Sequence, residues 1–90
     1  MIKFVVDIRK GILALGGQLH CDAEALLLEA GSKQSDLWGA NFYPGNPKES
    51  RIEYTSLINI RPSVGNNAME IRDEKIRNQV KLSVEKLLEC

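Results

Sequence analysis

The sequence predicts an α+β domain: a mainly antiparallel four-stranded sheet with helices on one face. Three observations predict this fold. Four segments are rich in β-branched or aromatic residues, two segments have helical character, and the connections are too short for parallel crossovers. With 90 residues, 43% of them hydrophobic and 27% charged, the chain has the composition of a soluble globular protein. We therefore predict a single domain over residues 1–90, with the element order β-β-α-β-β-α.

The first predicted element is a β-hairpin. Residues 2–8 are rich in β-branched side chains and lead into the turn 9–11. Gly11 suits the positive φ that a tight turn requires. Residues 12–15 then return as the antiparallel partner strand.

A short helix is predicted next, over residues 22–30. Asp22 is a suitable N-cap, the following residues are good helix formers, and Gly31 suits the C′ position. Three successive leucines, residues 26–28, leave a strand that turns at Gly31 as the alternative.

Two further strands are predicted in the middle of the chain. Residues 37–43 carry Trp, Phe and Tyr and stop at Pro44. Residues 52–61 show the clearest alternation and stop at Pro62. This alternation places one set of residues on the apolar side (Ile52, Tyr54, Ile58, Ile60) and another on the polar side (Glu53, Thr55, Asn59, Arg61).

The last segment is predicted to be an amphipathic helix. Asp73 is a suitable cap, and Glu74 complements the positive end of the helix dipole. The apolar residues recur at helical spacing: Ile76, Val80, Val84 and Leu87.

The sheet face turned away from the helices is predicted to be mixed in character. It would carry Val5, Asp7, Asn41, Tyr43, Thr55, Leu57, Asn59 and Arg61. Such a face is either a dimer interface or the floor of a site. A small domain has a thin margin of stability, so we expect a homodimer. Burial of Val5, Leu57 and Trp38 against a second copy would favour this interpretation.

Charge and cysteine content exclude several classes of function. Twelve basic and twelve acidic residues give a net charge of zero, which argues against a nucleic-acid partner. Apolar runs fall far short of the ~20 residues of a membrane helix, and no signal peptide is evident. One His and two distant Cys make neither a disulfide framework nor a metal site, so we expect a cytoplasmic protein without metal or cofactor.

His20 and Asp22 are the candidate catalytic residues. An imidazole beside a carboxylate can act as an acid–base pair. The alternative is structural: Asp22 caps the helix, and the nearby Glu24 points into solvent. Cys21 is adjacent to His20 in sequence, but neighbours on an extended chain point to opposite sides.

The candidate ligand-binding residues are Asn59, Arg61, Ser63, Asn66 and Asn67. Arg61 ends a predicted strand, and its planar fork matches a carboxylate or phosphate. The alternative is that Arg61 pairs with a carboxylate from Glu53, Glu70 or Asp7, while the asparagines cap turns. Trp38 is expected in core or interface packing, with a stacking platform as the alternative.

Four segments resemble a family of small uncharacterised prokaryotic proteins: GGQLHCD (16–22), LLLE (26–29), GSKQSDLWG (31–39) and IEYTSLINIRP (52–62). The Gly65-Asn66 pair and the closing Ile76-Arg77 segment also fit. The resemblance implies no established activity. It also implies a further N-terminal segment in other members, so we expect a short variant or a piece of a longer chain. Members often carry Arg-Ser where this chain has Asn67-Ala68, which weakens an anion-binding role for the loop.

The sequence therefore favours a homodimeric binding or interaction module without catalysis. The alternative is a small-molecule enzyme or an anion-binding protein that uses Arg61 and the 63–67 loop. Convergence of His20, Asp22, Asn59 and Arg61 on one pocket would favour the alternative.

Overall fold

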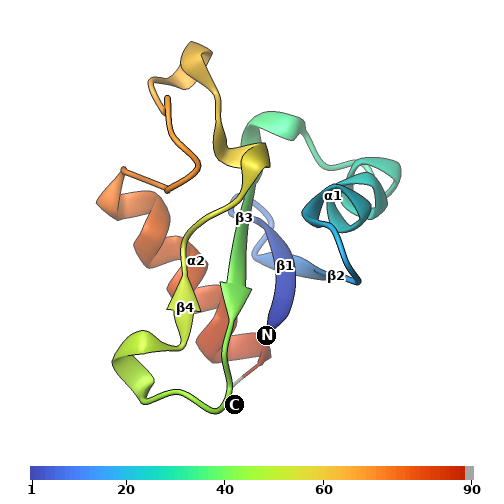
Figure 1. Cartoon of the computed structure of the whole chain (residues 1–90). Helices are drawn as coiled ribbons and strands as arrows, with labels where there is room; N and C mark the ends of the chain where they lie inside the picture. The colour runs from blue at the N-terminus through green and yellow to red at the C-terminus, as the bar shows by residue number, and fades with distance from the viewer. Residues whose placement is uncertain (89–90) are drawn as a thin grey trace.

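A computed structural model describes residues 1–88 and confirms the α+β fold and the order of its elements (Figure 1). All pairings in the four-stranded sheet are antiparallel, and the strand order is β2-β1-β3-β4. The strands are β1 (Ile2–Asp7), β2 (Ile12–Gly16), β3 (Leu37–Phe42) and β4 (Ile52–Glu53), and the helices are α1 (His20–Glu29) and α2 (Glu74–Leu87).

The predicted hairpin is confirmed and is stabilised by a buried carboxylate. Gly11 adopts φ +68° in the turn between β1 and β2. The Asp7 carboxylate accepts hydrogen bonds from the backbone N–H groups of Arg9 and Lys10, both at 2.9 Å, and from the Ser32 hydroxyl at 2.7 Å. The carboxylate therefore joins the hairpin turn to the chain that follows α1.

The two helices cover opposite faces of the sheet, so the expectation of helices on one face is wrong (Figure 1). The core beneath α2 contains Phe4, Val6, Trp38, Ala40, Phe42, Ile71, Val80 and Val84. The core beneath α1 contains Val5, Ala23, Leu27 and Leu37. Successive strand residues point to opposite faces, which sends Val5 and Val6 to different cores. The inner strands β1 and β3 are buried on both faces, and that burial hides the alternation expected of a strand with one solvated face.

Helix α1 begins two residues before its predicted cap. Leu19 occupies the N-cap position, and Asp22 lies in the first turn, so the capping role predicted for Asp22 is wrong. The predicted end is confirmed. Gly31 has φ +98°, its N–H donates to Leu28, and the N–H of Ser32 donates to Leu27, which together form a Schellman motif.

Helix α2 matches its prediction closely. The Asp73 side chain accepts a hydrogen bond of 2.8 Å from the Lys75 backbone N–H, as expected of an N-cap. Val80 and Val84 are fully buried against the sheet. Within residues 1–88, no helix is long and apolar enough to span a bilayer.

The predicted strand over residues 52–61 is wrong beyond Glu53. Strand β4 contains only Ile52 and Glu53, and the chain then forms a one-turn 3-10 helix over Leu57–Asn59. The Ser56 hydroxyl accepts from the Ile58 N–H and starts this turn, an example of a polar side chain that competes with the sheet for backbone groups. As a result Ile60 is 44% exposed, whereas Asn59 and Arg61 are buried, the reverse of the predicted pattern.

Candidate functional site

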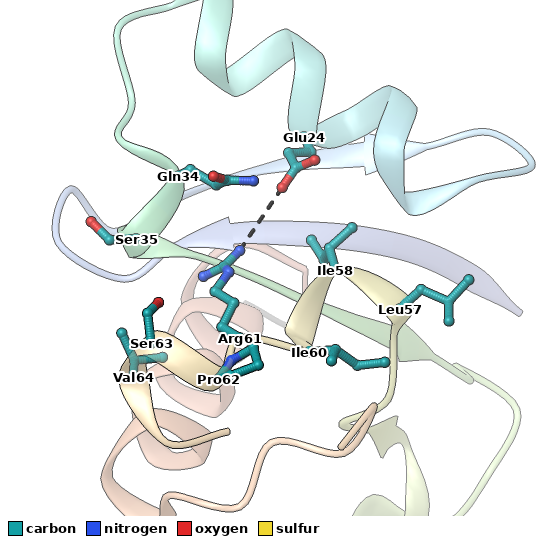
Figure 2. Close-up of a pocket in the computed structure, with 10 residues that line it drawn as sticks. All are labelled: Glu24, Gln34, Ser35, Leu57, Ile58, Ile60, Arg61, Pro62, Ser63 and Val64. Carbon is teal, nitrogen blue, oxygen red and sulfur yellow. Dashed lines mark ion pairs between the residues drawn. The ribbon is translucent and has the colours of Figure 1, made fainter. Parts of the chain in front are cut away.

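Arg61 is held by a tight loop between the 3-10 turn and α2. The backbone N–H of Arg61 donates to the Asn66 carbonyl at 2.7 Å, and the Asn66 N–H donates back to the Arg61 carbonyl at 3.1 Å. Gly65 closes the loop with φ +79°, a conformation that favours glycine. The loop thereby fixes the Arg61 Cα, from which its side chain extends toward α1 (Figure 2).

Two buried asparagines support this loop through their side-chain amides. The Asn66 amide nitrogen donates to the carbonyls of Asn59, Ala68 and Glu70 at 2.8–3.1 Å, and its oxygen accepts from the Arg72 N–H at 3.0 Å. The Asn59 amide accepts from the Gly39 N–H at 2.8 Å and donates to the Gly39 and Met69 carbonyls. Both amides are therefore occupied by backbone groups, as the turn-capping alternative predicts.

Gly39 lets the 3-10 turn approach strand β3 closely. A Cβ atom at this position would lie 2.7 Å from the Ser56 Cβ and 3.1 Å from the Ile58 Cγ1. Strand β4 pairs only with Asn41 and Phe42 of β3. At Gly39 the Asn59 amide takes the place of a neighbouring strand, because it bonds to both the N–H and the carbonyl of Gly39.

A pocket of about 410 Å³ opens where this loop faces α1 and the start of β3 (Figure 2). Its polar lining residues are Glu24, Gln34, Ser35, Arg61 and Ser63, and its apolar lining residues are Leu57, Ile58, Ile60, Pro62 and Val64. Gln34 and Ser35 lie across the pocket from Leu57, whereas Val64 lies beside Ser63 (Figure 2). Polar and apolar side chains therefore share the lining of the pocket.

The Arg61 side chain is 10% exposed, and its guanidinium lacks hydrogen-bond acceptors. None of its three nitrogens donates a hydrogen bond to residues 1–88. The nearest carboxylate oxygen, Glu24 Oε2, lies 3.9 Å from Nη2, beyond hydrogen-bond distance. Burial lowers the pKa of the Arg61 guanidinium, and Glu24 partly offsets this effect. Arginine nevertheless stays charged in proteins, so the pocket contains a buried cation.

Trp38 forms the other side of the guanidinium's environment. The Arg61 Cζ lies 5.0 Å from the centroid of the indole ring, within the range of a cation–π contact. Trp38 is 2% exposed, so the expected core packing is confirmed, and the face of its ring also contacts Arg61. This contact uses none of the guanidinium's N–H donors.

The five predicted ligand-binding residues separate into two groups. Arg61 and Ser63 line the pocket, whereas Asn59, Asn66 and the exposed Asn67 do not. Arg61 pairs with none of the carboxylates expected from the sequence. Asp7 binds the hairpin turn, and Glu53 accepts hydrogen bonds from Asn41 and Tyr43. The carboxylate that faces Arg61 is Glu24, which the sequence predicts to point into solvent.

The predicted catalytic residues lie elsewhere. His20 lines a second pocket of about 440 Å³, with Lys3, Asn41 and Tyr43 among its other lining residues. The His20 Nε2 lies 2.7 Å from the Ala40 carbonyl, which can only accept, so Nε2 carries the hydrogen. Burial lowers the pKa of His20, and this outweighs the opposing effect of the Ala40 hydrogen bond. Asp22 is exposed on α1. His20, Asp22, Asn59 and Arg61 therefore do not converge on one pocket.

The polar residues Glu24, Gln34 and Ser35 complete the Arg61 pocket. Gln34 and Ser35 lie in the GSKQSDLWG segment (31–39), but no sequence pattern connects any of the three with Arg61. They come from α1 and from the 3-10 turn before β3, both far from Arg61 along the chain. Only the position of α1 over the sheet brings them together. In residues 1–88, no group of three or more His, Cys, Asp or Glu side chains is placed to hold a metal ion.

The fold and the pocket define a small α+β domain with a buried arginine facing a mixed polar and apolar cavity. The chain belongs to the DUF5674 family, described as proteins of unknown function, whose family model matches residues 1–87. No curated protein and no solved structure matches the chain.

Proposed function

We propose that this protein binds a small ligand with a carboxylate or phosphate group, which the Arg61 guanidinium recognises. The observation that carries the proposal is the buried guanidinium whose three nitrogens have no hydrogen-bond acceptor in residues 1–88. A buried charge that makes no hydrogen bonds destabilises the folded state by roughly several kcal/mol, even after the surrounding structure relaxes. An anionic ligand supplies the missing acceptors.

The surroundings of Arg61 suit a binding role. The contact with Trp38 uses none of the guanidinium's N–H donors, and the planar fork of an arginine can bind a carboxylate or phosphate through two parallel hydrogen bonds. Ser63, Ser35 and Gln34 add neutral hydrogen-bonding groups to the same pocket. His20, the residue best suited to proton transfer at neutral pH, lines the other pocket, so we propose binding rather than catalysis here.

Thermal unfolding with simple anions tests this proposal. Acetate, 4-methylpentanoate and inorganic phosphate are titrated at millimolar concentrations against the wild type and Arg61→Met. A ligand that binds only the folded state raises the melting temperature. We expect at least one anion to do so in the wild type and not in Arg61→Met, while the exposed-arginine control Arg9→Met behaves as wild type. Equal shifts in both arginine variants, or no shift in the wild type, would contradict the proposal.

We also propose that the protein forms a homodimer, through the free edge of β2 and the adjacent outer surface of α1. Leu15 on β2 and Leu26 on α1 are 54% and 57% exposed, and an edge strand presents unpaired backbone groups to a second copy. The interface expected from the sequence does not fit, because Val5 and Trp38 are buried within the single chain. Sedimentation equilibrium should show a dimer that Leu15→Lys dissociates. A wild-type monomer would contradict this proposal.

A further inference from the structure

We infer that the ligand of the Arg61 pocket is an α-amino acid with an apolar side chain, whose carboxylate binds Arg61 and whose ammonium binds Glu24. This inference rests on the proposed function and narrows it. A simple anion would satisfy only one of the two charged groups that line the pocket, whereas an amino acid carries a complement to each.

One oxygen of the Glu24 carboxylate, like the guanidinium, lacks a hydrogen-bond partner within the described chain. Its Oε2 is buried and has no hydrogen-bond donor in residues 1–88, although the side chain lies beside a cation. The two groups therefore form an ion pair at 3.9 Å that includes no hydrogen bond. A ligand with both an acceptor and a donor would supply the hydrogen bonds that each of them lacks.

The 3.9 Å separation suits such a ligand. Charge-assisted hydrogen bonds are about 2.8 Å long. In an α-amino acid, the ammonium nitrogen and the nearer carboxylate oxygen are separated by only two carbons. These two atoms are therefore somewhat closer together than the protein atoms Nη2 and Oε2. Hydrogen bonds of this length can therefore join the ligand's carboxylate to Nη2 and its ammonium to Oε2 at the same time.

The apolar lining residues of the pocket provide surface for the ligand's side chain. Leu57, Ile60 and Val64 are 71%, 44% and 54% exposed, so they have apolar area to bury. The Arg61 nitrogens and Glu24 Oε2 have almost no exposed surface, so binding as we propose requires side chains at the rim to rotate away. Leu57 and Val64 lie on one-turn 3-10 segments, where exposed side chains change rotamer readily.

Glu24 also discriminates against other anions. A phosphate or simple carboxylate bound to Arg61 would place like charge near Glu24, which costs free energy in a water-poor site. The C-terminal residue of a peptide offers a carboxylate and an amide N–H, but that N–H has no charge to pair with Glu24. The geometry therefore favours a free ammonium group over a neutral donor.

Isothermal titration calorimetry with three ligands of similar shape tests the inference. Leucine has both charged groups, 4-methylpentanoate lacks the ammonium, and N-acetyl-leucine has a neutral amide in its place. We expect leucine to bind wild-type protein at least about tenfold more tightly than either of the others, because a hydrogen bond to a charged group is lost. Equal affinity of leucine and 4-methylpentanoate would overturn the amino-acid inference and leave the anion proposal standing.

Variants of Glu24 give an independent measure. Glu24→Gln keeps the shape of the side chain and should reduce leucine affinity while it leaves or raises that of 4-methylpentanoate. The matched control Glu29→Gln, at an exposed site on the same helix, should retain the wild-type preference. Preference for N-acetyl-leucine over leucine would identify a peptide C-terminus and overturn the inference. Failure of all three ligands to bind would overturn the amino-acid inference and exclude these carboxylates, and the phosphate titration would then decide the anion proposal.

Discussion

Asn59 and Arg61 are two residues apart in sequence and both are buried, but their side chains differ in hydrogen bonding. The Asn59 amide makes three hydrogen bonds to backbone groups of Gly39 and Met69. The Arg61 guanidinium makes none with residues 1–88 and faces a pocket instead. One residue completes the fold, whereas the other is available to a ligand.

The difference shows how to separate structural from functional polar residues in this chain. A buried amide with all its partners stabilises one arrangement of the backbone. A buried cation without hydrogen-bond acceptors destabilises the folded state unless something else binds it.

The largest effect is expected for Asn59→Asp. A carboxylate cannot donate to the Gly39 and Met69 carbonyls, and it would be fully buried beside them. We expect the free energy of unfolding to fall by at least about 3 kcal/mol, measured by urea denaturation. Asn67→Asp, the same change at an exposed position, should have little effect. Equal stability of the two variants would show that the Asn59 amide does not organise the loop.

Gly39→Ala tests the strand surface to which Asn59 binds. The new Cβ would meet the Ser56 Cβ at 2.7 Å and displace the 3-10 turn. Overpacking of this kind costs about 1–3 kcal/mol, which should appear as a lower urea midpoint. Gly17→Ala is the control, because a Cβ there has no neighbour within 4 Å. An unchanged midpoint for Gly39→Ala would mean that the turn does not pack against β3 as described.

Asp7→Asn tests a buried carboxylate whose hydrogen bonds are satisfied, in contrast to Glu24. Burial raises the pKa of Asp7, but the hydrogen bonds from Ser32, Lys10 and Arg9 outweigh it, and the pKa is lowered from 3.8. A carboxyl group whose pKa is lower in the folded than in the unfolded state stabilises the fold at pH values above its unfolded-state pKa. This stabilisation is lost as the pH falls through the folded-state pKa. We expect the variant to lose about 1–2 kcal/mol at pH 7.

Unfolding free energies between pH 5 and pH 2 provide the second readout for Asp7. The wild type and the exposed-site control Asp22→Asn should lose stability more steeply toward acid pH than Asp7→Asn. If the free energy of unfolding fell equally steeply with decreasing pH in all three proteins, the role assigned to Asp7 would be contradicted.

Local patterns predicted the elements that depend on local chemistry. The turn at Gly11, the Gly31 terminus of α1 and the Asp73 cap of α2 each follow from one residue and its near neighbours. The position of α1 cannot be predicted in this way. It depends on the burial of β1 on both faces, which follows only from the packing of both helices.

The alternation over residues 52–61 led to a wrong strand prediction for a related reason. Apolar and polar residues alternate there as in a strand, but the Ser56 and Asn59 side chains bind backbone groups and break the ladder. Arg61 and Ser63 were identified from the strand-end position and the loop. Glu24 was not, because its partner lies 37 residues away in sequence, and no local signal connects them.

The free energy of unfolding of the double variant Glu24→Gln/Arg61→Met tests the central claim most directly. Methionine keeps an apolar stem against Trp38, and removal of both charges avoids a lone buried ion. If the pair is retained for a ligand, stability without ligand should be unchanged or higher by about 1–4 kcal/mol, as for other buried pairs replaced by neutral residues. A loss of about 3 kcal/mol or more would show that Arg61, like Asn59, serves the fold.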